Sequence, residues 1–290
     1  MIAASVPVQR WDFSAIGTSW RIDSTPPLGA DDRAAVTSVV EAFDRDWSRF
    51  RDDSTVRRIS GGGSAAAPPD TEAMLALYAE LDSATGGAVN PLVGKALAKR
   101  GYDAAISLRD RGPSAAPADW RTLVDATGGR LALRAPAVID VGAVGKGRLV
   151  DLVLAELRGR VDGGLVVDAS GDLAVSGLPQ RVALEHPYDR TRAIGLWVLS
   201  DGALCASATN RRAWGEGLHH VLDARTGEPV RAYAATWAVA ADAMTADAVA
   251  TALFFDGGPR FAADRDASWV RMRTDGSVEW SPDCEAELFV

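Results

Sequence analysis

Asp247 and Thr251 are two oxygen-bearing residues placed four positions apart in a segment rich in helix-forming residues. On a helix, residues four apart lie one turn above each other, so this carboxylate and this hydroxyl are expected to share a face. Paired hard oxygens suit Mg²⁺, which usually keeps several waters and takes further ligands from phosphate groups. A simpler explanation stays open: Thr245 could cap the helix while Asp247 favours its positive end.

A glycine-rich run over 140–147 has the residues to bind phosphate. Its sequence, Asp-Val-Gly-Ala-Val-Gly-Lys-Gly, lies between a strand-like segment over 131–141 and a helical pattern over 149–157. Glycine lets the backbone approach a ligand, free N–H groups at a helix start attract an anion, and Lys146 adds a full positive charge. An ordinary tight turn is the commoner explanation of such a run, and the spacing of a Walker loop is missing.

His219 and His220 are adjacent, and Asp223 follows three residues after the second. If the segment is extended, the two imidazoles point to opposite faces and only one of them can face a given site. That histidine could take a proton from a hydroxyl nucleophile, with the carboxylate orienting it, and activity would rise with pH through an apparent pKa near that of histidine. The alternative is a hydrogen-bonded histidine at a strand end. The pattern argues against a zinc site, because no third or fourth ligand is suitably spaced.

The composition excludes several classes of function. A formal net charge of -8 opposes binding to nucleic acid, and no basic run offsets it. The two cysteines have neither metal-ligand spacing nor the density of a disulfide framework. No apolar segment is long enough to cross a membrane, and the start over 1–9 is short and broken by Pro7, so no secretory signal is visible. We therefore expect a cytoplasmic location.

The elements that must position these residues are mixed helices and strands. We predict a strand over 13–23, amphipathic helices over 31–50 and 71–82, and a hairpin around Asp275-Gly276. No linker is long enough to separate domains, and regular βαβ alternation is absent. The sequence thus predicts one domain over 1–290 of the α+β class, with mixed or antiparallel sheets and packed helices.

Taken together, six segments resemble, in order and separation, the ApbE-like family of FAD:protein FMN transferases. Three of them are similar to the family's early motifs: Ile16-Gly17-Thr18, the Trp-Ser-Arg-Phe-Arg-Asp-Asp-Ser run over 47–54, and Gly87-Ala88-Val89-Asn90-Pro91. The other three are 140–151, which resembles Asp-x-Gly-x-x-x-Lys-Gly-x-x-x-Asp, 220–227, and the Ala-Asp-x-x-x-Thr stretch over 246–251.

The resemblance implies an ApbE-like, T-fold-like architecture and a Mg²⁺-dependent transfer of FMN from FAD to a threonine hydroxyl of a target flavoprotein, with release of AMP. It places the metal on Asp247, Thr251 and the carbonyl of Ala143. It gives catalytic roles to His220, Lys146 and Asp223. Its implied FAD contacts are Ile16, Gly17, Thr18, Phe50, Ala88, Val89, Asn90, Asp140, Lys146, Ser207 and Leu222.

The chain also departs from the family pattern. Phe50 stands where the family has tyrosine, Asn90 where it has aspartate, and Ala224 where a proline follows the aspartate. A non-catalytic FAD carrier and a Mg²⁺-dependent FAD pyrophosphatase are therefore kept as alternatives. The family suggests an acceptor threonine in a Ser/Thr-Gly-Ala-Thr-like motif, and its members are often exported, unlike the location expected here.

Overall fold

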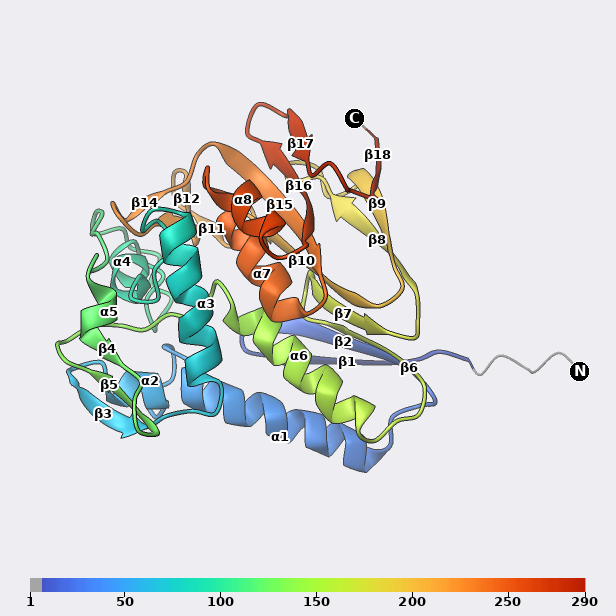
Figure 1. The fold of residues 1–290 in the computed structure, drawn as a ribbon, viewed down its shortest axis with the longest axis horizontal. Coiled ribbons are helices and arrows are strands. Elements are labelled where there is room, and N and C mark those ends of the chain that lie inside the picture. Colours follow the sequence, from blue (N-terminus) through green and yellow to red (C-terminus); the bar gives the residue numbers. More distant parts are fainter. Residues whose placement is uncertain (1–6, 290) are drawn as a thin grey trace, which may run out of the picture.

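The computed structural model describes residues 7–289, and its largest element is an eight-stranded sheet in which all neighbouring strands are antiparallel (Figure 1). In spatial order its strands are β1 (Gln9–Ala15), β2 (Thr18–Thr25), β6 (Gly164–Asp168), β7 (Asp172–Ser176), β10 (Gly202–Ala208), β15 (Tyr233–Ala240), β16 (Ser268–Arg273) and β17 (Val278–Trp280). The central strands, such as β15, are buried along almost their whole length because both faces of the sheet are covered.

Helices cover one face of this sheet. The helices of the described residues are α1 (Ala30–Trp47), α2 (Thr55–Arg58), α3 (Thr71–Ala84), α4 (Gly94–Lys99), α5 (Trp120–Leu123), α6 (Gly145–Arg158), α7 (Ala243–Ala252) and α8 (Gly258–Ala263). Helix α6 lies between α1 and α7 (Figure 1). Its apolar stripe, including Leu149, Val153 and Leu157, is fully buried in the larger of the hydrophobic cores.

A small sheet covers the opposite face. It has the order β18 (Glu287–Leu288), β9 (Ala193–Leu199), β8 (Gln180–Glu185). Trp197 of β9 and Trp237 of β15 are buried together in a second core between the two sheets. The molecule is thus layered as helices, large sheet and small sheet, and the predicted α+β class with antiparallel sheets is confirmed.

Local predictions met different outcomes. The predicted helices over 31–50 and 71–82 correspond to α1 and α3, and the Asp275-Gly276 turn joins β16 to β17 as predicted. The single strand predicted over 13–23 is wrong, because Ile16 and Gly17 adopt positive φ angles of 45° and 72° and fold the segment into the β1–β2 hairpin. The strand predicted over 131–141 is confined to β5 (Arg130–Leu133).

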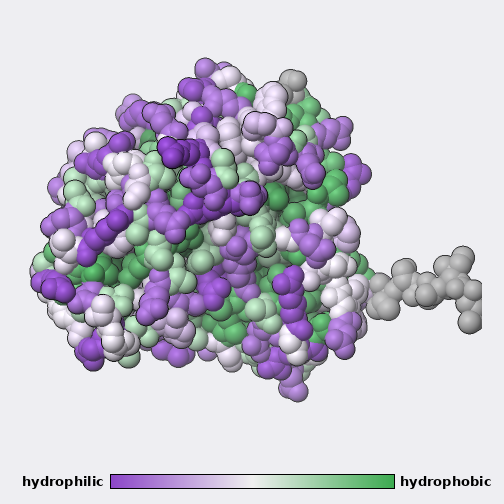
Figure 2. Space-filling model, in the orientation of Figure 1, coloured by the Kyte–Doolittle hydropathy of each residue, from purple (hydrophilic) through white to green (hydrophobic). Residues whose placement is uncertain are grey.

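The remaining strands are short and form small sheets outside the eight-stranded sheet, on the side of the molecule that carries the helices. They are β3 (Gly63–Ala66) and β4 (Val124–Asp125), both paired with β5, and the ribbons β11 (Ala213–Trp214) with β12 (Leu218–His219) and β13 (Leu222–Asp223) with β14 (Glu228–Pro229). Within residues 7–289 no helix is long and apolar enough to span a membrane. Polar side chains cover most of the face in Figure 2, with apolar ones between them in small groups.

Candidate functional site

A cavity of about 770 Å³ opens where the glycine-rich turn, α7 and the histidine loop meet. This volume lies in the range of small-molecule and cofactor sites. Its charged lining is mostly cationic among the described residues, although the whole chain has a formal net charge of -8. The charged groups are Arg49, Arg51, Lys146, Arg211 and Arg212 against Asp44, Asp140 and Asp247. The cavity can therefore attract an anionic ligand that the rest of the surface repels.

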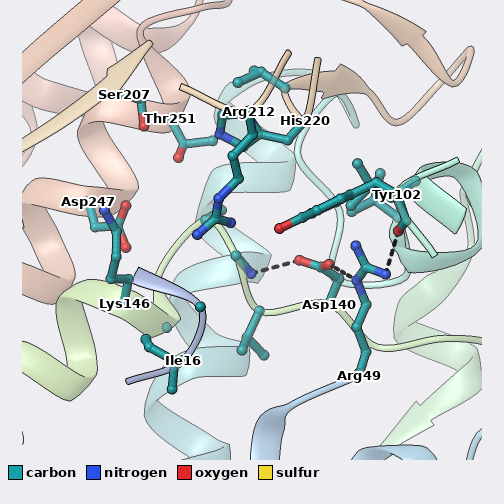
Figure 3. A pocket seen from close by; sticks show the side chains of 18 of the residues that line it. Ile16, Arg49, Tyr102, Asp140, Lys146, Ser207, Arg212, His220, Asp247 and Thr251 are labelled. Carbon is teal, nitrogen blue, oxygen red and sulfur yellow. Dashed lines mark hydrogen bonds and ion pairs between the residues drawn. The ribbon is translucent and has the colours of Figure 1, made fainter. Parts of the chain in front are cut away.

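The cavity collects almost all of the residues singled out in the sequence. It is lined by Ile16, Gly17, Thr18, Phe50, Ala88, Val89, Asn90, Asp140, Ala143, Lys146, Ser207, His220, Leu222, Asp247 and Thr251. Asp223 is the exception. These residues come from segments far apart in the chain, and Figure 3 shows side chains from several of them directed toward one space.

The glycine-rich turn is held in place by a tyrosine that the sequence did not single out. The hydroxyl of Tyr78, on α3, donates to the carbonyl oxygen of Asp140 at 3.0 Å and accepts from the N–H of Ala143 at 3.2 Å. Burial raises the pKa of Tyr78 well above its usual value, so the phenol stays protonated and can donate. The carboxylate of Asp140 also accepts from the N–H of Gly142 at 2.8 Å. The turn is therefore fixed before α6 begins.

Asp140 faces a cation and aromatic cluster that forms one wall of the cavity. Nε of Arg49 donates to the Asp140 carboxylate, and Nη1 of the same residue donates to the carbonyl oxygen of Tyr102 at 2.8 Å (Figure 3). The guanidinium lies 4.1 Å from the centre of the Phe50 ring and 4.9 Å from that of Tyr102. One oxygen of Asp140, which was predicted to contact FAD, thus accepts a hydrogen bond from Arg49. The ring of Phe50, which was predicted to face the flavin, packs against the guanidinium of Arg49.

Lys146, in the first turn of α6, is held by a carboxylate behind the cavity. Its Nζ lies 2.9 Å from Oδ2 of Asp172, a fully buried side chain at the start of β7. Burial alone would lower the pKa of Lys146, but the charges of Asp172 and Asp247 outweigh burial and raise it. Lys146 is therefore a permanent cation near neutral pH.

Asp247 and Thr251 share a face of α7, as predicted, and both reach the cavity. The helix is capped by Asp242, whose side chain accepts from the N–H of Thr245 at 2.8 Å, so the alternative of a Thr245 cap is wrong. Asp151 of α6 also accepts from the N–H groups of Ala243 and Met244, at 2.8 and 2.9 Å. These contacts fix the start of α7 against α6.

Asp247 uses only one of its two carboxylate oxygens in a hydrogen bond within the described residues. Its Oδ2 accepts from the N–H of Gly147 at 3.0 Å, whereas no donor to Oδ1 is found within residues 7–289. Burial, followed by the nearby charge of Asp172, raises the pKa of Asp247 to about 8 in the metal-free chain. A carboxylate, a hydroxyl and the backbone carbonyl of Ala143 would be the proposed donors. No group of three or more His, Cys, Asp or Glu side chains that could hold a metal is found over 7–289.

The two histidines point to opposite sides, as predicted. His219 is buried, with Nε2 2.9 Å from the carbonyl oxygen of Val230 and Nδ1 accepting from the N–H of Val221 at 3.3 Å. His220 lines the cavity, and its buried Nδ1 has no hydrogen-bond partner in the described chain. Burial, aided by the charge of Arg212, lowers the pKa of His220 to about 3. The imidazole is therefore neutral at pH 7.

Asp223 does not orient His220. Its carboxylate accepts from Nε, Nη2 and the backbone N–H of Arg225, and it does not line the cavity. Its backbone oxygen accepts from Thr226 and Gly227 and closes the turn between β13 and β14. The carboxylate that follows His220 in the sequence is thus a turn-stabilising group, and the catalytic role implied for it is not kept.

The other predicted contact residues shape the cavity mainly through backbone and apolar groups. Asn90 uses its amide for local structure, donating to the carbonyl of Pro117 and accepting from the N–H of Leu92, both at 2.8 Å. Ser207 lies near the end of β10, next to the helix that carries Thr251 (Figure 3). Leu222 supplies a buried apolar surface.

Comparisons with known proteins agree with this architecture. The chain is 28% identical to an FAD:protein FMN transferase of Rhodobacter capsulatus over 99% of its own length, and it spans about 60% of that relative. It is 25% identical to an FAD:protein FMN transferase of Klebsiella pneumoniae, covering 76% of this chain and 70% of the relative.

Solved structures share the fold. The ApbE protein of Thermotoga maritima superposes with a TM-score of 0.82 at 23% identity, covering 95% of this chain and 97% of that one. The flavinyl transferase ApbE of Pseudomonas stutzeri gives 0.80 at 18% identity, covering 97% of each chain. The sequence model of the ApbE family matches residues 16–268, which contain the whole cavity lining described above. The chain therefore belongs to the ApbE family.

Proposed function

We propose that this chain is an FAD:protein FMN transferase that moves FMN from FAD onto a threonine hydroxyl of a target flavoprotein. The observation that carries the proposal is the meeting, in one cavity, of a buried carboxylate, a cationic lysine and a neutral histidine: Asp247, Lys146 and His220. The curated relatives carry the name of this activity, which supports the same reaction here.

The residues have distinct parts in binding. Asp247, Thr251 and the carbonyl of Ala143 would hold Mg²⁺, which when bound supplies positive charge that offsets the charge on the pyrophosphate. Lys146 would place its ammonium against the same phosphates. The aromatic wall of Phe50 and Tyr102 would face the flavin end of FAD, whereas residues 88–90 would line the adenine end.

The chemistry is a phosphoryl transfer. The threonine oxygen attacks the phosphorus on the FMN side, the bond from that phosphorus to the bridging oxygen breaks, and AMP leaves with that oxygen. The proton of the threonine hydroxyl passes to His220. This imidazole is neutral in the folded chain without substrate, and its lowered pKa makes it a weak base there; the negative phosphates of bound FAD would raise that pKa toward the working pH. Lys146 stabilises the negative charge that develops on the phosphate oxygens.

The test uses the purified chain, FAD, Mg²⁺ and a synthetic peptide that contains Ser-Gly-Ala-Thr. We expect mass spectrometry to find an FMN adduct on the threonine and chromatography to find an equal amount of AMP. The matched control is the same peptide with Thr replaced by Val, which keeps the shape but removes the hydroxyl. AMP without an adduct would mean an FAD pyrophosphatase, and neither product would mean a carrier, so both outcomes contradict the proposal.

A further inference from the structure

Asp172 is a carboxylate that lies behind the wall of the cavity and not in it. Its side chain is fully buried, and Oδ2 lies 2.9 Å from Nζ of Lys146. Oδ1 is 3.4 Å from the backbone N–H of Ala206, which donates to it from β10. Asp172 is not among the residues that line the cavity. Asp172 therefore acts on a bound substrate only through its neighbours: through Lys146, with which it forms an ion pair, and through its charge on Asp247.

The surroundings of Asp172 make Lys146 its necessary partner. Within residues 7–289, Lys146 is the only cation within 4.0 Å of this carboxylate. Removing a carboxylate from water costs several kcal/mol unless a charged partner and hydrogen bonds compensate. The buried carboxylate of Asp172 thus needs the ammonium of Lys146 beside it, and this need restricts the position of that ammonium.

Of the two residues in this ion pair, Lys146 has the flexible side chain, so its position is the one that the pairing restricts. Lysine carries about 2 kcal/mol of rotamer entropy in its four-carbon chain. Asp172, in contrast, sits on a central strand that pairs with β6 on one side and β10 on the other. An ammonium has three N–H donors. The ammonium of Lys146 forms an ion pair with Oδ2 of Asp172 at 2.9 Å and donates to the carbonyl oxygen of Ala169 at 3.4 Å, so N–H donors remain for the cavity.

We propose that Asp172 is a positioning residue that holds the ammonium of Lys146 where it meets the phosphates of FAD. The inference rests on the proposed function, because it assigns Lys146 to the transferred phosphate. It adds a residue that does not touch the substrate and that nothing in the sequence motifs had marked.

Four variants test this proposal: Asp172→Asn, Lys146→Met, the double variant and Asp23→Asn. Asp23 is the matched control, because it is a buried aspartate of the same sheet, ion-paired with Arg10 at 2.8 Å and not part of the cavity lining. The measurements are the single-turnover rate of FMN transfer to the peptide at saturating FAD and Mg²⁺, the Kd of FAD, and the Tm of each variant.

We expect Asp172→Asn to slow transfer by about 10- to 100-fold, the usual effect of losing a residue that orients a functional group, with FAD affinity within about threefold. Lys146→Met should slow it by about 10²- to 10³-fold. The double variant should be no slower than Lys146→Met, because Asp172 acts through the lysine. It should also have a higher Tm than Lys146→Met, since that single variant leaves a buried carboxylate unpaired. Asp23→Asn should transfer at the parent rate within about twofold.

A wild-type rate in Asp172→Asn overturns the inference, and so does a double variant whose loss is the product of the two single losses. If Asp172→Asn does not fold, the comparison of Lys146→Met with the double variant still decides, because it asks whether losing Asp172 matters once the lysine is gone. If the parent chain transfers no FMN and releases no AMP, the proposed function itself has failed. Transfer by the parent with no effect of Asp172→Asn means that the inference alone has failed.

Discussion

At the scale of single residues, two residues of the same type have different partners and different protonation states in this site. The adjacent histidines differ because His219 satisfies both ring nitrogens with backbone groups, whereas His220 faces the cavity with a lowered pKa. The buried aspartates differ likewise: Asp172 is balanced by Lys146, and Asp247 has an oxygen directed to no protein donor within the described chain. Environment, and not residue type, therefore assigns the proposed roles of structural partner, base and metal ligand.

The first residue-scale prediction concerns the base. His220→Ala should slow transfer by about 10²- to 10⁴-fold with little change in FAD affinity. His219→Ala should lower the Tm, because two backbone hydrogen bonds are lost, while the rate in the folded fraction stays near that of the parent. Single-turnover assays and thermal unfolding of both variants check this. A His219→Ala rate as low as that of His220→Ala would refute the assignment.

The pH dependence of His220 is also predictable. Because burial lowers its folded pKa to about 3, the neutral base is present throughout the range from pH 5 to 8, and the histidine limb expected near neutral pH from the sequence should be absent. The folded state pays for excluding that proton: stability from this group is present above the unfolded pKa of about 6.5 and falls as pH drops below it. Rate profiles and urea unfolding at several pH values measure the two effects. A rate limb that is centred near pH 6.5 and disappears in His220→Ala would contradict the assignment of a buried base.

The pKa of Asp247 is shifted in the opposite direction to that of His220. Its pKa is raised to about 8, so at pH 7 most of the chain carries this carboxyl protonated, and Mg²⁺ bound at the proposed site would have to displace the proton. Affinity for Mg²⁺ should therefore rise with pH by up to about tenfold per unit and level off above pH 8. Calorimetry at pH 7 in two buffers of different ionisation enthalpy should show proton release. Asp247→Asn should abolish Mg²⁺ binding, and a pH-independent affinity in the parent would contradict the site.

At the scale of elements, the site depends on how closely α6 and α7 approach. A Cβ added at Gly147 would lie 2.1 Å from the carbonyl oxygen of Ala243 and 2.8 Å from Cβ of Asp247. The φ angle of Gly147 is not in the left-handed region, so backbone conformation does not require a glycine here. The close approach of the two helices does. The same approach lets the N–H of Gly147 reach Asp247, and Asp151 cap the start of α7. Helix packing and the position of the proposed metal ligand Asp247 are therefore one arrangement.

Gly147→Ala tests that coupling. The added methyl must push the helices apart, which should cost about 1 to 3 kcal/mol of unfolding free energy and weaken Mg²⁺ binding. Gly159→Ala, at the other end of α6, is the control, because its nearest neighbour atom would be 3.5 Å away, an ordinary contact. Denaturant unfolding and Mg²⁺ titration measure both effects. Equal stability and equal metal affinity in the two variants would show that the helix contact does not set the site.

At the scale of the whole molecule, the cavity is lined by helices and loops that are assembled on one large sheet, whose strands come from both ends of the chain. Strands β1 and β17 are its two edges, and the turn over 16–18 and the end of β10 both reach the cavity. We therefore keep the proposal that residues 1–290 act as one domain. The cationic lining lies within an acidic molecule, which favours a small anionic substrate over a nucleic acid.

The whole-molecule prediction is that FAD binds at least about tenfold more tightly than FMN. In the proposed arrangement FAD would contact the aromatic wall, Lys146 and the surface over 88–90 together, whereas FMN would leave the surface over 88–90 without a partner. A tenfold ratio corresponds to about 1.4 kcal/mol, which a few extra contacts supply. Calorimetry with FAD, FMN and AMP checks it. Equal affinity for FAD and FMN would mean that the adenine end is not used.

The sequence by itself determined what repeats along the chain. The period of about 3.6 residues predicted α1, α3 and the buried stripe of α6, and placed Asp247 and Thr251 on one face. Strand alternation predicted that only one of His219 and His220 could face the site. These features follow from local backbone geometry, so the spacing of residues is sufficient to predict them.

Only the tertiary structure decided which side chains become partners. Arg49 meets Asp140 across 91 positions and Tyr78 meets the glycine-rich turn across 62, and no local pattern specifies such pairs. Asp223 lies near His220 in the sequence, but its carboxylate accepts hydrogen bonds from Arg225. Asp172 lies far from Lys146 in the sequence, but the two form an ion pair. The physical reason is that charge pairing and burial depend on which elements pack together, and that packing is a property of the complete sheet and its helices.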